Sequence, residues 1–281
     1  MVDSIHGVSP TQFKTRHDIS MTWEGLRLWL AWTDMDNEVW VAGVDEAAAK
    51  QRRGEQIVFD RPHWVASGAV TGPSVVPGIG GFTKTGVIVA FANADQRIVV
   101  RTVLAAEEYE AVLGETTRHR PSLSWQRGLW LAWTGGGGTL NTIRARQALD
   151  FEDKVTYGEA SYCSPALGND VSHLVLAWNG TDKRRSMNVA SIDEHSGELY
   201  GRLTLEEVAG GDTGPGLGAE GSVFVLAWGA PAPFPICTVQ PWEGSRTFVE
   251  NGQQKTRLAP AIEPPLLAWV DLDNVIQIGG V

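Results

Sequence analysis

The sequence contains few of the residue types on which small secreted folds and metal sites depend. Its 281 residues include only two cysteines, four tyrosines and six histidines. Two cysteines cannot build a framework of several disulfides. We expect Cys163 and Cys237 to be buried free thiols, because the strands that we assign to them lie one repeat apart, which is a poor geometry for a disulfide.

Long apolar runs and an excess of positive charge are also lacking. No run reaches the length of a transmembrane helix, and residues 1–20 have no signal-peptide-like apolar stretch. As written, the chain is expected to be cytoplasmic, although the mature form of a secreted protein would read the same way. Its net charge of −10 gives no positive field for phosphates, so we expect neither nucleic acid nor a membrane as a partner.

Tryptophan and glycine are abundant, with 12 and 32 residues, and an apolar strand ending in Ala-Trp or Ala-Phe occurs six times. The closing aromatic residues are 41 to 59 positions apart. A repeat of about 40–50 residues made of short strands is typical of a β-propeller, in which each repeat is one four-stranded blade. The six copies are Leu28–Trp32, Ile88–Phe91, Leu129–Trp133, Leu174–Trp178, Phe224–Trp228 and Leu266–Trp269.

The two ends of the chain predict how the ring closes. The sixth repeat stops at Val281, after its third strand Val275–Ile278, so it has no outer strand of its own. Residues Thr11–Thr15 can supply that strand and remove an exposed sheet edge. We therefore predict an all-β, six-bladed β-propeller, one domain over residues 1–281, closed by the N-terminal strand. Five blades with an irregular cap is the alternative.

The repeated tryptophans are expected to pack between blades rather than to bind a ligand. Trp32, Trp133, Trp178, Trp228 and Trp269 recur at one position of a strand that is apolar throughout. Apolar residues that recur in this way usually form the core. Tryptophans outside this pattern are better candidates for ligand contact.

Several stretches resemble a family of bacterial and fungal propellers with Leu-Ala-Trp blades, which is close to sialidase-like and lectin-like propellers. One blade matches through Pro165–Leu167, Leu176–Asp182 and Met187–Val189, and another through Ala132–Gly135 with Leu140–Thr142. The resemblance covers nearly the whole chain and implies the propeller fold and carbohydrate binding. The Ser-x-Asp-x-Gly-x-Thr-Trp turn common in sialidases is absent, which argues against a glycosidase.

The connections from an outer strand to the next inner strand carry the main functional signal. Thr15–Trp23 and Thr117–Trp125 are nearly the same sequence, and Arg61–Trp64 is assigned to the connection between them. In a propeller these connections surround one mouth of the central channel. Arginine holds anionic or carbonyl oxygens, and histidine can move a proton near neutral pH. The predicted ligand-binding residues are Arg16, Trp23, His63, Trp64, Arg118, Arg120 and Trp125.

The core repeats while the connections differ between blades, which favours one asymmetric pocket over six equivalent sites. We predict a small-ligand or carbohydrate-binding propeller with its pocket at that mouth. The alternative is a cofactor-independent enzyme, such as a cyclase, isomerase or hydrolase, with His17, His119 and Asp18 as catalytic residues. A third interpretation is that the Thr-Arg-His repeat was inherited by duplication and only satisfies loop backbone. We expect no cofactor and no metal, and the sequence indicates no oligomeric state.

Overall fold

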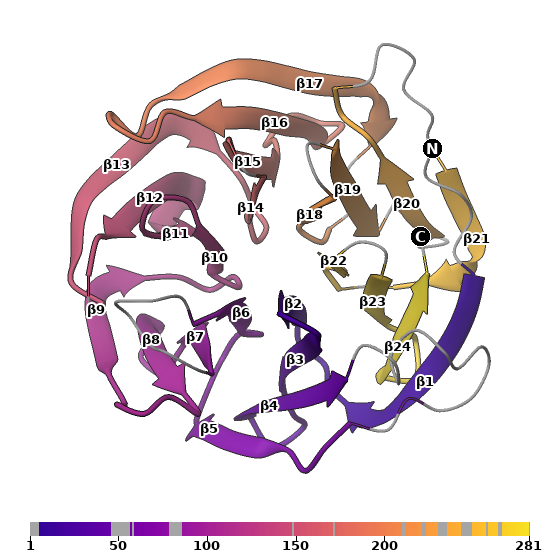
Figure 1. Cartoon of the computed structure of the whole chain (residues 1–281). Helices are drawn as coiled ribbons and strands as arrows, with labels where there is room; N and C mark the ends of the chain where they lie inside the picture. The colour runs from indigo at the N-terminus through magenta and orange to yellow at the C-terminus, as the bar shows by residue number, and fades with distance from the viewer. Residues whose placement is uncertain are drawn as a thin grey trace.

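The structure, a computed structural model, describes residues 6–45, 57, 59–78, 86–147, 149–170, 172–209, 212–220, 223–229, 235–242, 249–256, 258–263 and 266–280. Within these residues the chain forms six four-stranded antiparallel sheets arranged as blades around a ring (Figure 1). The predicted all-β, six-bladed propeller is confirmed. No helix in the described part of the chain is long and apolar enough to cross a membrane.

The blades follow one another along the chain, each from an innermost strand to a strand on the rim (Figure 1). Blade 1 contains β2 (Ser20–Glu24), β3 (Arg27–Thr33), β4 (Glu38–Asp45) and β5 (His63–Ser67). Blade 2 contains β6 (Ser74–Pro77), β7 (Val87–Ala92), β8 (Arg97–Val103) and β9 (Glu110–Thr116). Blade 3 contains β10 (Ser122–Trp125), β11 (Leu129–Thr134), β12 (Thr139–Ala145) and β13 (Phe151–Ala160), with the short 3₁₀ turn η1 (Gly136–Gly138).

Blade 4 contains β14 (Ala166–Asn169), β15 (Leu174–Asn179), β16 (Ser186–Ile192) and β17 (Leu199–Ala209). Blade 5 contains β18 (Gly216–Glu220), β19 (Val223–Gly229), β20 (Pro235–Val239) and β21 (Val249–Lys255). Blade 6 joins the two ends of the chain: β22 (Ala261–Glu263), β23 (Leu266–Val270), β24 (Val275–Gly280) and β1 (His6–Lys14).

Ring closure by the N-terminal strand is confirmed. Strand β1 pairs antiparallel with β24, with Pro10 opposite Gln277 and Lys14 opposite Val275. The ring of Phe13 then stacks on Trp32 of blade 1, with centroids 4.1 Å apart and planes at 22°. The closing strand therefore holds blade 6 through its backbone and blade 1 through its side chains.

All six blades share one register. The first residue of each inner strand pairs with the alanine of the Ala-aromatic motif, for example Ser20 with Ala31 and Ala261 with Ala268. The aromatic residues that follow are buried, with Phe91 at 2% exposure and the five tryptophans at 3% or less. Their predicted role in packing is confirmed. Because the register is constant, residues at one position can be compared across the blades.

The prediction that both cysteines are buried free thiols can be tested for one of them. Cys163 is a buried free thiol, as predicted, and burial raises its pKa to about 11. Its Sγ–H donates to the carbonyl of Asp212, with Sγ and O 3.3 Å apart. The side chain of Cys237 lies outside the described residues.

Candidate functional site

The inner strands all run in the same direction, so the central channel has two different ends. We call the end where inner strands begin the connector face, because the connections from the previous outer strands arrive there. We call the opposite end, where each inner strand turns into the second strand, the turn face. The sequence predicts the pocket at the connector face.

Arg120 closes the channel at the connector face. This side chain is only 6% exposed, although it carries a charge. From blade 3 its guanidinium donates to the carbonyl of Ile19 in blade 1 and to that of Pro215 before blade 5, 3.4 Å away. Blades 1, 3 and 5 alternate around the ring of six. A guanidinium that extends from blade 3 to the starts of blades 1 and 5 therefore lies across the channel axis. Burial lowers the pKa of Arg120, and the negative charge of Asp18 partly offsets this effect.

Asp18 connects several blades at the connector face. One carboxylate oxygen accepts the Ser164 hydroxyl at 2.8 Å, and the other accepts the backbone N–H of Ala259 at 2.9 Å. The backbone is equally crowded there, since a Cβ on Gly72 would lie 1.9 Å from the Asp18 carbonyl oxygen. Asp18 thus joins blade 1 to the starts of blades 4 and 6. An enzyme that uses Asp18 is not favoured, because both of its oxygens already accept protein hydrogen bonds.

The repeated Thr-Arg-His sequence forms the same turn twice. Thr15 and Thr117 each accept, through the hydroxyl oxygen, the backbone N–H two residues later, at 2.9 and 3.1 Å. His17 and His119 are half-buried, and burial lowers the pKa of both while Asp18 opposes the shift. Neither histidine lines the channel cavity. The geometry supports the third interpretation, in which the repeat satisfies loop backbone.

The two exposed arginines of this repeat contact neighbouring turns. Arg16 donates to the side-chain oxygen of Asn37 at 3.3 Å, and Arg118 donates to that of Gln96 at 3.1 Å. Both partners belong to turns between the second and third strands. Neither Arg16 nor Arg118 lines the channel cavity.

The assignment of His63 and Trp64 to a channel-mouth connection is wrong. Both are exposed residues of β5, the outer strand of blade 1, and pair with Val41 and Trp40. In the sequence, the apolar residues at positions 57–59 favour an outer strand at that place. Ile57 and Phe59 are indeed buried, but neither is assigned to a strand. An outer strand with one side in solvent carries a weaker apolar signal than the loop that packs beneath it.

Trp23 and Trp125 lie at the other end of the channel from the histidines. They are near the ends of β2 and β10, at the turn face, and both are half-buried. The Trp125 indole N–H donates to the carbonyl of Pro77 in blade 2 at 2.7 Å. Of the ten predicted site residues, only three border the channel cavity: Trp23, Arg120 and Trp125.

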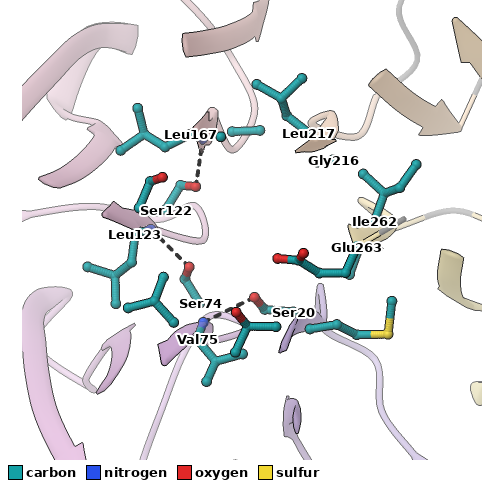
Figure 2. Close-up of a pocket in the computed structure, with 18 of the residues that line it drawn as sticks. Ser20, Ser74, Val75, Ser122, Leu123, Leu167, Gly216, Leu217, Ile262 and Glu263 are labelled. Carbon is teal, nitrogen blue, oxygen red and sulfur yellow. Dashed lines mark hydrogen bonds between the residues drawn. The ribbon is translucent and has the colours of Figure 1, made fainter. Parts of the chain in front are cut away.

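The channel contains a cavity of about 230 Å³ (Figure 2). Among the described lining residues, Arg120 alone carries a positive charge, and it forms the floor of the cavity at the connector face. Lining residues continue to the ends of the inner strands, including the exposed Asn169, so the cavity opens toward the turn face. Its hydroxyl groups belong to Ser20, Thr22, Ser74, Ser122 and Ser124.

Three of those hydroxyls connect neighbouring blades. Ser20, Ser74 and Ser122 accept the backbone N–H groups of Val75, Leu123 and Leu167, at 2.8 to 3.0 Å (Figure 2). The same position in blades 4 to 6 holds Ala166, Gly216 and Ala261, which have no hydroxyl. The cavity is therefore asymmetric, although the ring is regular.

Among the described residues, Glu263 is the one carboxylate that borders the cavity. It ends β22, and its side chain points away from the strand into the cavity (Figure 2). It makes no hydrogen bond or ion pair with another described residue, and burial raises its pKa to about 8. A buried ionisable group with a strongly shifted pKa in a cavity is a candidate functional group.

Sequence reasoning missed Glu263 because no motif surrounds it. Glu263 differs from the equivalent residues of the other blades, but this difference can be recognised only when the register of the inner strands is known. The corresponding positions of the other blades hold small or apolar residues, namely Thr22, Val76, Ser124, Gly168 and Gly218.

A cleft of about 440 Å³ also lies between β1 and blade 1, lined in part by Phe13, Trp32, Trp40 and Arg61. This cleft is not repeated with the same residues. The position of Trp40, opposite the motif aromatic, holds Val99, Asn141, Asn188, Cys237 and Gln277 in the other blades. Among the described residues, no three His, Cys, Asp or Glu side chains gather as ligands for a metal ion.

No protein-family model and no curated protein matches this sequence. Among solved structures, the chain is similar to the lectin SapL1 in complex with alpha methyl fucoside, with 14% identity, a TM-score of 0.63, and 91% of this chain and 88% of that chain covered. It is also similar to a variant of Aleuria aurantia lectin in complex with Fucalpha1-6GlcNAc, with 10% identity, a TM-score of 0.64, and 96% and 93% covered. The β-propeller domain of Myceliophteria thermophila Cps50 (Swd1) matches at 15% identity with a TM-score of 0.52, and 93% and 83% are covered. At these identities the likeness shows the propeller fold.

Proposed function

We propose that this propeller binds a small, neutral, polyhydroxylated ligand, such as one sugar ring, in the channel cavity through the turn face. The observation that carries the proposal is the Glu263 carboxyl, which points into the cavity, is half-buried and has no partner among the described residues. Polar groups shielded from bulk water normally have a hydrogen-bond partner. A ligand hydroxyl is a suitable partner.

The protonation state of Glu263 suits a neutral ligand. With a pKa raised to about 8, the carboxyl keeps its proton at neutral pH. A protonated carboxyl donates one hydrogen bond and accepts others, as a sugar hydroxyl does. Met21, Leu217 and Ile262 occupy the position of Val75, whose N–H reaches Ser20, and the preceding blades hold no serine for them. Their backbone N–H groups are the further donors that we propose for a ligand.

The size of the cavity and the similarity to two solved lectin structures support the same class of ligand. The cavity of about 230 Å³ is smaller than the roughly 300–1,000 Å³ typical of sites for drug-sized ligands. It therefore suits a single ring or the end of a longer saccharide. The two lectins described above are bound to fucosides and have TM-scores above 0.6 with this chain.

Isothermal titration at pH 6.5 tests the proposal with alpha-methyl fucoside and a panel of other methyl glycosides. We expect one glycoside to bind with a stoichiometry of one, and Glu263→Ala to weaken it at least tenfold. Glu152→Ala, an exposed carboxylate on β13, should bind as the parent protein does. Thermal unfolding of each variant confirms that it is folded. No binding across the panel, or a Glu263→Ala variant with unchanged affinity, would overturn the proposal.

A further inference from the structure

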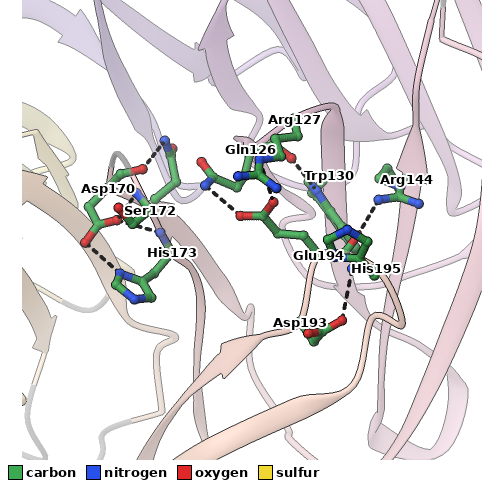
Figure 3. A network of polar contacts seen from close by, with 11 residues as sticks. Gln126, Arg127, Trp130, Arg144, Asp170, Ser172, His173, Asp193, Glu194 and His195 are labelled. Atoms are coloured by element: carbon green, nitrogen blue, oxygen red, sulfur yellow. Dashed lines mark hydrogen bonds and ion pairs between the residues drawn. The ribbon is translucent and has the colours of Figure 1, made fainter.

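A second cavity, of about 250 Å³, lies on the turn face between blades 3 and 4. Its lining is almost entirely charged: Arg127, Arg144, Arg146, Glu194 and His195. The three arginines come from blade 3, and the other two residues come from the turn that leads to the outer strand of blade 4. Figure 3 shows the polar contacts around this site, which we call the arginine pocket.

Arg144 forms the fixed wall of the arginine pocket. Its side chain is 9% exposed, and its guanidinium lies over the buried Trp130 ring, 5.0 Å from the centroid. One terminal nitrogen donates to the Glu194 carbonyl at 2.5 Å, and the other donates to Asp153 at 3.2 Å. Its Nε is buried and has no hydrogen-bond partner among the described residues. A buried arginine of this kind is positioned before any ligand arrives.

Arg127 and Arg146 leave most of their donors available. Arg127 is 73% exposed, and its only ion pair within the described residues joins its Nε to Glu194 at 3.2 Å. Arg146 is 66% exposed and contacts Asp153 through one terminal nitrogen at 3.1 Å. A guanidinium has five N–H donors. Several N–H groups of each arginine therefore remain for a ligand.

The pocket has more guanidinium groups than ion-pair partners. The three guanidinium groups pair with two carboxylates, Glu194 and Asp153, and a third carboxylate, Asp193, accepts the backbone N–H of His195 at 3.0 Å at the edge of the pocket. The other oxygen of Glu194 accepts the Gln126 amide N–H at 2.7 Å. Paired guanidinium donors bind carboxylate and sulfate oxygens in a two-point geometry.

The arginine pocket adjoins the mouth of the channel. Arg127 follows Trp125, a residue that lines the channel cavity, by two positions. Between them, Gln126 contacts Glu194 of the pocket. On the same face, the Ser124 hydroxyl donates to Asn169 at 2.8 Å, so the polar surface continues from blade 3 to blade 4.

We propose that the arginine pocket binds a carboxylate or sulfate group, carried by an acidic saccharide whose neighbouring ring enters the channel. The pocket itself stands on the contacts above, whereas the link to a saccharide rests on the proposed function. The expected ligand is therefore a saccharide that places a neutral ring in the channel and carries a uronic acid or a sulfated sugar next to it.

Titration at low ionic strength with sodium sulfate, glucuronate and methyl glucoside tests the pocket. Arg127→Gln and Arg146→Gln should each weaken sulfate and glucuronate about tenfold, because each removes charge-assisted donors. Arg97→Gln, an exposed arginine at the start of β8, serves as the matched control and should change affinity less than twofold. Both anions should bind more weakly as salt is added. Absence of sulfate and glucuronate binding, or equal affinity in all three variants, would overturn the proposal.

A Glu263→Ala variant separates this proposal from the proposed function. If sulfate binding persists in that variant while no neutral glycoside binds the parent protein, the channel function fails and the anion site stands. If neutral glycosides bind through Glu263 but the arginine variants keep full affinity for sulfate and glucuronate, the channel function stands and the anion site fails.

Discussion

Phe13→Ala tests how the N-terminal strand holds the ring closed. Phe13 is 8% exposed and packs on Trp32 of blade 1 and on Phe59, with ring centroids 4.1 and 5.7 Å away. Removing a buried phenylalanine side chain costs about 3–5 kcal/mol. Both neighbouring rings are themselves buried and fixed, so they cannot collapse into the space. We therefore expect a loss of about 4 kcal/mol.

This loss is large against a total free energy of unfolding of about 5–15 kcal/mol for a typical domain. Urea unfolding followed by tryptophan fluorescence and by circular dichroism measures it, and agreement between the two signals justifies a two-state analysis. In a thermal scan we expect a decrease in Tm of roughly 8–16 °C, at about 2–4 °C per kcal/mol.

Gln12→Ala is the matched control, because Gln12 lies on the same strand and is exposed. It should change stability by less than about 0.5 kcal/mol. If Phe13→Ala cost no more than Gln12→Ala, packing of β1 against blade 1 would contribute nothing to closure. The backbone pairing of β1 with β24 would then be the only contact that matters.

Two further predictions concern buried charges. The pKa of Glu263 in the folded protein, about 8, lies above its ordinary value of 4.5, so between these pH values the folded protein holds a proton that the unfolded chain releases. The free energy of unfolding should therefore fall by up to about 1.4 kcal/mol per pH unit between pH 4.5 and 8. Glu263→Gln should flatten this slope in denaturant titrations at several pH values. Asp18→Ala should destabilise the fold by about 3–5 kcal/mol, because it leaves the buried Arg120 without its nearby negative charge; a variant as stable as the parent would contradict the role of Asp18 in joining the blades.

The architecture was predictable because it depends on repeated local signals. The Ala-aromatic strand recurs in every blade, and the truncated sixth repeat required a closing strand from elsewhere. The same reasoning failed for the outer strand of blade 1. There the buried Ile57 and Phe59 suggested a strand, whereas the strand itself begins at the exposed His63. Apolar residues indicate which segments of the chain are buried. Here the buried residues belong to a loop, and the strand that pairs in the sheet comes after it.

The candidate site was harder to predict, because sequence similarity between two connections indicated structure rather than chemistry. Thr15–His17 and Thr117–His119 look alike because each forms the same hydrogen-bonded turn. Arg120 departs from this pattern, and its partners in blades 1 and 5 are about 100 residues away along the chain. No local pattern in the sequence reveals such a contact, so the sequence alone does not indicate that Arg120 blocks this end of the channel.

The regular register also explains how a repeated fold produces one asymmetric pocket. At the first inner-strand position, serine in blades 1 to 3 joins each blade to the next, whereas Ala166, Gly216 and Ala261 leave the later blades without this bond. The backbone N–H groups that have no serine partner of this kind therefore lie on the side of the channel where Glu263 supplies a carboxyl. Equivalent sites in a repeated lectin would require the same residues in each blade. The inner strands also differ between blades at the positions that line the channel, which favours a single ligand held at the centre of the ring.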